Sequence, residues 1–511
     1  MGYMVGQNML LVLGLLLGGA FVTYLCGRIT RPALGEAGSG KLAGAASAVI
    51  LASALWLFWP LARAVWWRGD LPFTFLGGAK SPFSVQLQAD GFSILMSLVV
   101  LALAFVVAVY SIGYMNRDRG VEKYHALLLL MVAGMVGLTF TTDLFNLYVF
   151  FELMAVASYV LVAFRHDTWE PVEAAFKYLV MSATGSALAL LGIAIIFTYT
   201  GQLSFPEVFK ALENMSPVVG MLAAGLIIVG FGVKAAIVPL HTWLPDAHAA
   251  APSGISAMLS GVVIQSGLFA MMRVLLGVFG PATIPLGLVL ALFAVLTMTI
   301  GNLAALAQTD LKRMLAFSSI AQMGYILLGL GLGIWWCPRA IAGLSGGVFH
   351  IMTHAFMKGL AFLCAGVIVH QLGTRDIASM RGLGHRMPFV AICFAVAGLG
   401  LAGVPPLSGF MSKWLIYKAG IDIGSWYGYT FTIIAVANSV LSLGYYLPVI
   451  GAFWARERAP GVDRMREASP LCAVPIGALA LVTLVLGLYP QAGITAVRPA
   501  IEYLLRALGG M

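Results

Sequence analysis

The stretch from Asn8 to Cys26 reads NMLLVLGLLLGGAFVTYLC and contains no charged residue. A helix needs about 20 mainly apolar residues to cross the hydrocarbon core of a bilayer, and this run has that length. No basic residue precedes it, whereas a signal peptide carries positive charge before its apolar core. We therefore expect a first membrane-spanning helix and not a cleaved signal peptide.

Similar apolar runs recur along all 511 residues, of which 61% are hydrophobic and only 10% charged. Soluble proteins carry roughly 25% charged residues, so the composition predicts an all-α polytopic membrane protein with one membrane domain, 1–511. We count about fourteen spanning helices between short charged loops. They centre on Leu16, Leu55, Ala102, Met131, Leu153, Leu188, Gly230, Gly267, Ala294, Gln322, Phe356, Leu401, Val440 and Leu481.

The formal net charge of +9 comes from basic residues scattered singly among the loops. Because no basic block or aromatic-interleaved basic patch exists, binding of nucleic acid is excluded. The five cysteines are far apart and form no CxxC pair, so we expect no iron–sulfur cluster, zinc site, haem or other cofactor in this chain.

The Lys and Arg residues of alternate loops predict the orientation. With the N-terminus outside, the inner loops hold about 17 of them and the outer segments about eight, and an excess of basic residues marks the cytoplasmic side. Both termini are therefore expected on the outer side of a cell inner (plasma) membrane. The outer residues are Arg68, Lys80, Lys210, Arg273, Arg339, Lys418, Arg498 and Arg506.

Two predicted spans are interrupted in similar ways. In one, Lys234 is followed by Pro239 and Pro245, and in the other Pro405 and Pro406 precede Lys413. Proline removes a helical hydrogen bond and leaves a carbonyl free within the membrane. An ordinary proline kink explains either helix alone. A lysine beside each break favours an inverted repeat with its ion site at the breaks.

Glu152 is a third ionisable residue within an apolar run, and such residues usually line a polar pathway because charge at membrane depth is costly. Tyr148, four residues earlier, lies on the same helical face, and Asp143 begins the segment. The alternative is a glutamate paired to a neighbouring helix for stability alone.

Lys234 and His241 are two helical turns apart, about 10 Å in rise. A neighbouring carboxylate can decide whether a buried lysine is charged, so a Lys–Glu pair that forms and breaks is a plausible switch. His241 has an equally simple interpretation as a satisfied core histidine.

His350, His354 and Lys358 follow one another at intervals of four residues, each step rising about 6 Å along one helix face. One or two waters can bridge such steps, and the ordinary pKa of histidine suits proton relay. The two histidines also have zinc-like spacing. However, the glutamate of HExxH and a third ligand are missing, so no metal site is expected.

These residues lie in motifs that resemble the antiporter-like subunits of respiratory complex I, Mrp-type cation/proton antiporters and membrane-bound hydrogenases. The chain is most similar to the Mrp D and hydrogenase types in its Phe150-Phe151-Glu152 form, since the mitochondrial type more often has tryptophan before the glutamate. The matching stretches are Asp143–Glu152, AAFKY (174–178), GVK (232–234), PLHTWLPDAH (239–248), DLKRMLAFSS (310–319), His350–Lys358 and PPLSGFMSK (405–413).

The resemblance implies helices 1–3 in 1–122, one five-helix repeat in 123–282, an inverted second repeat in 283–455, and helix 14 with a tail in 456–511. Helices 7 and 12 would be the broken ones. It also implies a central hydrophilic axis. By motif match this axis contains Glu152, Lys234, His241, His248, His350, His354, Lys358 and Lys413.

Gln265 departs from this pattern, because the family often has a lysine there. Glutamine can hydrogen-bond and orient water but cannot hold a transferable charge at neutral pH. Either the middle of the relay runs through water and histidines, or this subunit moves ions differently.

We therefore expect an ion-translocating subunit, for protons or sodium ions, that works with paralogous and other membrane subunits in the lipid bilayer. A structural subunit whose buried charges only hold helices together, and a stand-alone carrier, are the alternatives. Since no redox centre is encoded, any electron transfer would occur in partner subunits. The driving reaction (cation exchange, NADH, ferredoxin or hydrogen chemistry) stays open.

Overall fold

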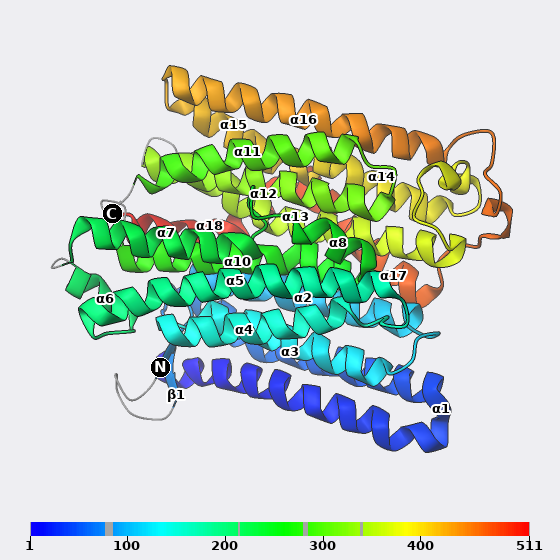
Figure 1. Ribbon diagram of the computed structural model, residues 1–511, viewed down its shortest axis with the longest axis horizontal. Helices are drawn as coiled ribbons and strands as arrows, with labels where there is room; N and C mark the ends of the chain where they lie inside the picture. Colours follow the sequence, from blue (N-terminus) through cyan, green and yellow to red (C-terminus); the bar gives the residue numbers. More distant parts are fainter. Residues whose placement is uncertain (1, 77–84, 213–214, 280–284, 338–340, 510–511) are drawn as a thin grey trace.

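The computed structural model describes residues 2–76, 85–212, 215–279, 285–337 and 341–509. Long helices run roughly parallel to one axis, which is horizontal in Figure 1. The long helices are α1 (Gly2–Arg68), α2 (Gly91–Tyr114), α3 (Val121–Phe140), α4 (Leu144–Val162), α5 (Trp169–Thr200), α7 (Pro217–Lys234), α10 (Ile264–Val274), α11 (Leu286–Leu306), α12 (Leu311–Trp335), α13 (Ile341–Leu372), α14 (Pro388–Ala402), α15 (Ser408–Asp422), α16 (Trp426–Phe453), α17 (Pro470–Leu488) and α18 (Pro490–Ala507).

Shorter elements connect them. They are the strands β1 (Phe73–Leu76) and β2 (Val85–Gln88), the helices α6 (Phe205–Ala211), α8 (Trp243–Ala250) and α9 (Ser253–Met258), the π-helices η2 (Leu259–Val263) and η3 (Leu275–Phe279), and the 3₁₀ turns η4 (Ala378–Met380), η5 (Leu383–His385) and η6 (Val462–Arg464). The two strands pair antiparallel, with Phe73 opposite Gln88.

Twelve of the described helical segments are long and apolar enough to cross a membrane. The number is thirteen if Ala378–His385 and α14, which meet at a bend of 114°, are taken as one span. The expected spans centred on Leu16 and Leu55 are both present as the two arms of α1, which is counted once among the twelve. Gly35 interrupts that helix with φ 69° and ψ 178°, which favours glycine. The two arms then pack together, because a Cβ at Gly19 would lie 2.8 Å from Ile50 Cγ2.

The two expected interruptions are present as helix ends. Helix α7 stops at Lys234 and α8 begins at Trp243, whereas α14 stops at Ala402 and α15 begins at Ser408. Both breaks contain a cis X-Pro bond, Val238–Pro239 and Pro405–Pro406. The prolines therefore mark where the backbone leaves the helix, as the sequence predicts.

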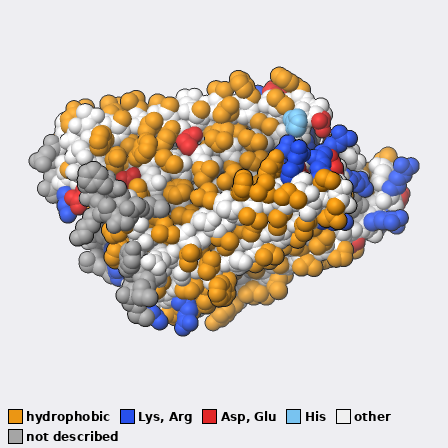
Figure 2. All heavy atoms as spheres, turned by 90° about the horizontal axis from the view of Figure 1, so that it is seen from below, with side chains coloured by type: hydrophobic (Ala, Val, Ile, Leu, Met, Phe, Trp, Pro, Cys, Tyr) orange, Lys and Arg blue, Asp and Glu red, His pale blue; other side chains and the backbone are white. Residues whose placement is uncertain are grey.

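The segment Ser253–Phe279, α12 and α13 form the most deeply buried part of the molecule. Helix α13 packs against α12, α14 and α15 on one side and against α2 and α9 on the other. Large apolar side chains instead cover the flank that Figure 2 draws. A polar helix face inside and an apolar surface outside is the arrangement that a lipid environment requires.

Both termini lie at one end of the helix bundle (Figure 1), and many Lys and Arg side chains gather at the other end of the face drawn in Figure 2. Lys80 and Arg339, two of the outer residues, lie outside the described residues. The sequence predicts one helix and a tail after residue 456. Instead, α17 is followed by a second helix, α18.

Candidate functional site

Glu152 lies on α4 and faces α5, where the Ser186 hydroxyl donates a hydrogen bond to its carboxylate. Its side chain is partly exposed on the described chain. Ser182 brings another buried hydroxyl to the same face of α5, one turn from Ser186. The carboxylate is therefore held by one hydroxyl of α5, with a second buried hydroxyl one turn away.

Lys234 is the last residue of α7 and is 1% exposed. Its Nζ lies 3.4 Å from Ser158 Oγ and over the rings of Tyr178 and Tyr159, at 4.5 and 5.0 Å from their centroids. Within the described residues no ion pair of 4.0 Å or less joins it to Glu152. Aromatic faces and a hydroxyl hold the ammonium group instead.

The break after Lys234 is held by aromatic packing. Trp243 Nε1 donates to the Val233 carbonyl at 2.8 Å, so one of the carbonyls freed at the end of α7 is satisfied. The Trp243 ring stacks on Tyr178 with centroids 3.9 Å apart. Gly267 of α10 lets that helix touch the break, since an added Cβ would lie 3.0 Å from Lys234 Cβ.

Gln265 and His354 meet in the middle of the molecule. Gln265 Nε2 lies 2.8 Å from His354 Nδ1 and donates to the Ile351 carbonyl at 2.9 Å. Gln265 Oε1 and His354 Nε2 are buried and make no hydrogen bond within the described residues. Buried polar atoms are usually satisfied, so we expect water to bind both.

A continuous hydrogen-bonded connection follows from His350 to Lys413. His350 Nε2 lies 3.0 Å from Gln322 Oε1, and Gln322 Nε2 donates to the Leu401 carbonyl at 2.9 Å. Lys413 Nζ donates to that same carbonyl at 2.7 Å. The rings of His350 and His354 have centroids 6.1 Å apart, so the two histidines are neighbours without a direct hydrogen bond.

Lys413 is 1% exposed and sits at the second break. Its Nζ lies 3.3 Å from Ser439 Oγ and 4.1 Å from the Tyr325 ring centroid. Tyr417 and Tyr325 both hydrogen-bond to Ser439, at 2.6 and 2.9 Å. Gly403 has φ 87° and leaves room for the lysine stem, because a Cβ there would lie 3.0 Å from Lys413 Cδ.

A second group of buried bases lies beside this connection. Lys358 donates to the Leu315 carbonyl at 2.8 Å. His248 stacks on Phe362, 4.7 Å between centroids, and neither ring nitrogen has a hydrogen-bond partner within the described residues. Lys312, counted from sequence as a loop charge, is 4% exposed and donates to the Ala251 carbonyl at 2.6 Å.

Three predicted residues lie apart from this group. His241 is partly exposed between α7 and α8 and makes no side-chain hydrogen bond to another candidate among the described residues. Asp143 is the N-cap of α4, accepting from the Asn146 amide at 2.7 Å, and burial raises its pKa. Tyr148 is partly exposed and stacks on Phe145.

Ser158, Ser186, Gln322 and Lys312 are the residues that sequence reasoning missed. Each is a polar side chain within or at the start of an apolar helix, which is the signal that could have identified it. Their partners lie on other helices, at least 28 residues away along the chain in every hydrogen bond described above.

Comparison with known proteins identifies the family. The family profile described as "NADH:quinone oxidoreductase/Mrp antiporter, TM" matches residues 141–442. The chain belongs to this family. A second profile, "NADH-Ubiquinone oxidoreductase (complex I), chain 5 N-terminus", matches residues 76–125.

Individual members of the family differ in the reactions their names describe. F(420)H(2) dehydrogenase subunit N of Methanosarcina mazei is 35% identical over 80% of this chain and 83% of its own length. A chain of the archaeal membrane-bound sulfane sulfur reductase has a TM-score of 0.87 at 30% identity, covering 99% of both chains. A chain of the Mrp complex from Dietzia sp. DQ12-45-1b has a TM-score of 0.84 at 26% identity, covering 99% of this chain and 100% of that one.

Proposed function

We propose that this antiporter-like subunit translocates protons across the membrane as part of a multisubunit complex. The observation that carries the proposal is the pair of buried bases His350 and Lys413, which Gln322 and the Leu401 carbonyl hold in place. The proton itself would pass between the bases over water, because neither an amide nor a backbone carbonyl takes up and releases a proton at physiological pH. Burying such groups is costly, and helices of a purely structural subunit do not require it.

Glu152 and Lys234 would form the switching end of the path. The two groups do not contact each other. The Glu152 carboxylate accepts from the Ser186 hydroxyl, and Lys234 Nζ donates to the Ser158 hydroxyl. A charge change in a neighbouring subunit would draw the two groups together or apart and alter the proton affinity of the lysine. The partly exposed Glu152 carboxylate supports this, since a neighbour can reach it.

Gln265 would not hold charge itself. It would orient bound water, and the protons would pass through that water. Its Nε2 fixes His354 Nδ1 as the acceptor, which leaves the unpartnered Nε2 of that ring to carry the proton. The axis offers amines, imidazoles and hydroxyls. Sodium would instead need several oxygen ligands, so we infer protons as the translocated ion.

The test is proton transport in inverted membrane vesicles, normalised to the amount of assembled complex. Lys413→Met and Glu152→Gln are expected to abolish most transport while the complex still assembles. Lys418→Met removes a nearby exposed amine and serves as the matched control. Full transport per assembled complex in Lys413→Met would contradict the proposal and support a structural subunit.

A further inference from the structure

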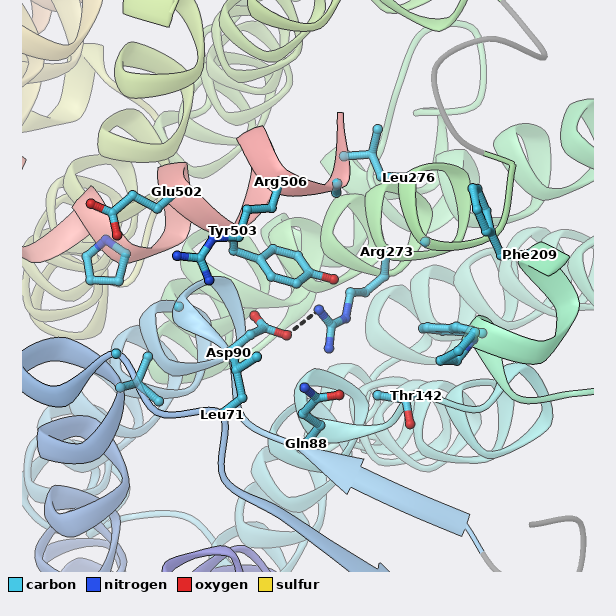
Figure 3. Close-up of a pocket in the computed structure, with 18 of the residues that line it drawn as sticks. Leu71, Gln88, Asp90, Thr142, Phe209, Arg273, Leu276, Glu502, Tyr503 and Arg506 are labelled. Atoms are coloured by element: carbon cyan, nitrogen blue, oxygen red, sulfur yellow. Dashed lines mark hydrogen bonds and ion pairs between the residues drawn. The ribbon is translucent and has the colours of Figure 1, made fainter. Parts of the chain in front are cut away.

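A cavity of about 660 Å³ opens near the end of the molecule that carries the two termini. It lies between the end of α1, the start of α2, α6, η3 and α18, away from the axis described above. Its volume is in the range of sites that hold small molecules. Figure 3 shows Arg273 and Asp90 at its centre.

Arg273 is 3% exposed and forms an ion pair with Asp90, which is 1% exposed. The other Asp90 oxygen accepts from the Phe92 and Ser93 amides, both at 2.9 Å, so this carboxylate also caps α2. Arg273 Nε is buried and has no hydrogen-bond partner within the described residues. An unused donor on a buried guanidinium group is costly unless a bound group satisfies it.

Further polar groups converge on the same point. The Tyr503 ring lies 5.1 Å from Arg273 Cζ, and Figure 3 shows its hydroxyl directed toward the guanidinium group. Gln88 and Thr142 lie on the opposite side of Arg273 in that view. The Thr142 hydroxyl already donates to the Gln86 carbonyl, which leaves the guanidinium, phenol and amide groups as the donors that fit a ligand rich in anionic oxygen atoms.

The wall also carries the charged residues Asp70, Glu502, Arg506 and Lys210. Glu502 is paired at 2.8 Å with Arg498, which is not a lining residue. Arg506 is exposed and has no ion-pair partner within the described chain. Lys210 has only a loose, exposed contact with Glu207, at 3.8 Å.

The rest of the wall is apolar. Phe205, Phe209, Leu71 and Leu276 line it, and Phe209 and Leu71 are 51% and 47% exposed. A free inorganic anion would not require such a wall, whereas the first methylenes of an acyl chain would bury against it.

We propose that this cavity binds a membrane phospholipid, with the phosphodiester on Arg273 and Tyr503 and an acyl chain against Phe205 and Phe209. The site lies at one end of the spanning helices, where lipid headgroups meet the protein. Arg506 and Lys210 at the mouth would favour an anionic headgroup.

The experiment is native mass spectrometry of the purified, delipidated complex, titrated with dioleoyl-phosphatidylglycerol, dioleoyl-phosphatidylethanolamine or inorganic phosphate. Tyr503→Phe and Arg506→Gln are each expected to weaken lipid binding about tenfold, the effect of losing one charge-assisted hydrogen bond. Arg119→Gln removes an exposed arginine between α2 and α3, which does not line the cavity, so it is the control and should bind lipid normally.

Arg273→Lys keeps the charge but loses the forked donors, so it should weaken binding if the complex assembles. Binding of either lipid with loss in Tyr503→Phe supports the proposal. Displacement of lipid by millimolar phosphate alone would instead identify a free-anion site. Equal loss in Arg119→Gln, or no lipid bound at this subunit, would overturn the proposal.

Discussion

Replacing Gln322 by leucine removes the amide that connects the second half of the polar axis. Gln322 is fully buried, lies 3.0 Å from His350 Nε2 and donates to the Leu401 carbonyl at 2.9 Å. Leucine fills nearly the same volume without either hydrogen bond. Lys413 remains on the Leu401 carbonyl, so both bases stay in place but lose their connection.

The expected magnitude follows from these two hydrogen bonds. Each contributes about 0.5–1.5 kcal/mol, and leaving His350 Nε2 unpaired adds a desolvation cost of about 1–3 kcal/mol. If about 2 kcal/mol of this total appears as a higher barrier for proton transfer, transport slows about thirtyfold. We therefore expect Gln322→Leu to assemble and to transport at a few per cent of the normal rate.

Asn302→Leu provides the matched control for this substitution. Asn302 is as buried as Gln322 and forms no hydrogen bond to His350 or Lys413. Its Nδ2 donates to Asn438 Oδ1 at 2.9 Å, and its Oδ1 accepts from the Tyr445 hydroxyl at 2.9 Å. Both variants lose comparable hydrogen bonds. Transport in inverted vesicles per assembled complex separates them, and equal transport by the two variants would refute the reasoning.

Three further predictions follow from the same geometry. Gln265→Leu should slow proton transport about tenfold because His354 Nδ1 loses its partner at 2.8 Å, and an unchanged rate in the vesicle assay would show that water alone suffices. Trp243→Phe keeps the stack on Tyr178 but loses the bond to Val233, so the complex should be destabilised by about 1–3 kcal/mol in thermal unfolding, with Trp335→Phe as the control. A protease site added at the C-terminus should be cut only from the outer side of intact cells or right-side-out vesicles, and cleavage in inverted vesicles would contradict the predicted orientation.

The sequence reveals the helix breaks because proline acts locally. Pro239 and the Pro405–Pro406 pair prevent helical hydrogen bonds wherever they stand, and the structure has helix ends beside each of them. Helix number was harder to predict near the C-terminus, where α18 follows α17 in place of the expected tail.

The contacts of the site depend on how distant helices pack. Gln322 meets His350 only because α12 and α13 lie side by side, and no local pattern marks that contact. For the same reason no local pattern in the sequence marks the burial of Lys312 on the carbonyl at the end of α8.

The four buried lysines of the described chain have different counter-charges. Lys312, Lys358 and Lys413 donate to backbone carbonyls, and the carbonyls of Leu401 and Ala402 belong to the C-terminal turn of α14, which carries partial negative charge. A carbonyl cannot be protonated at physiological pH, so this stabilisation is constant. Lys234 donates to no backbone carbonyl among the described residues, and its ammonium group lies on the Ser158 hydroxyl and the rings of Tyr178 and Tyr159. Three of the four lysines therefore have a counter-charge that no protonation event can change, whereas Lys234 depends on aromatic faces and one hydroxyl.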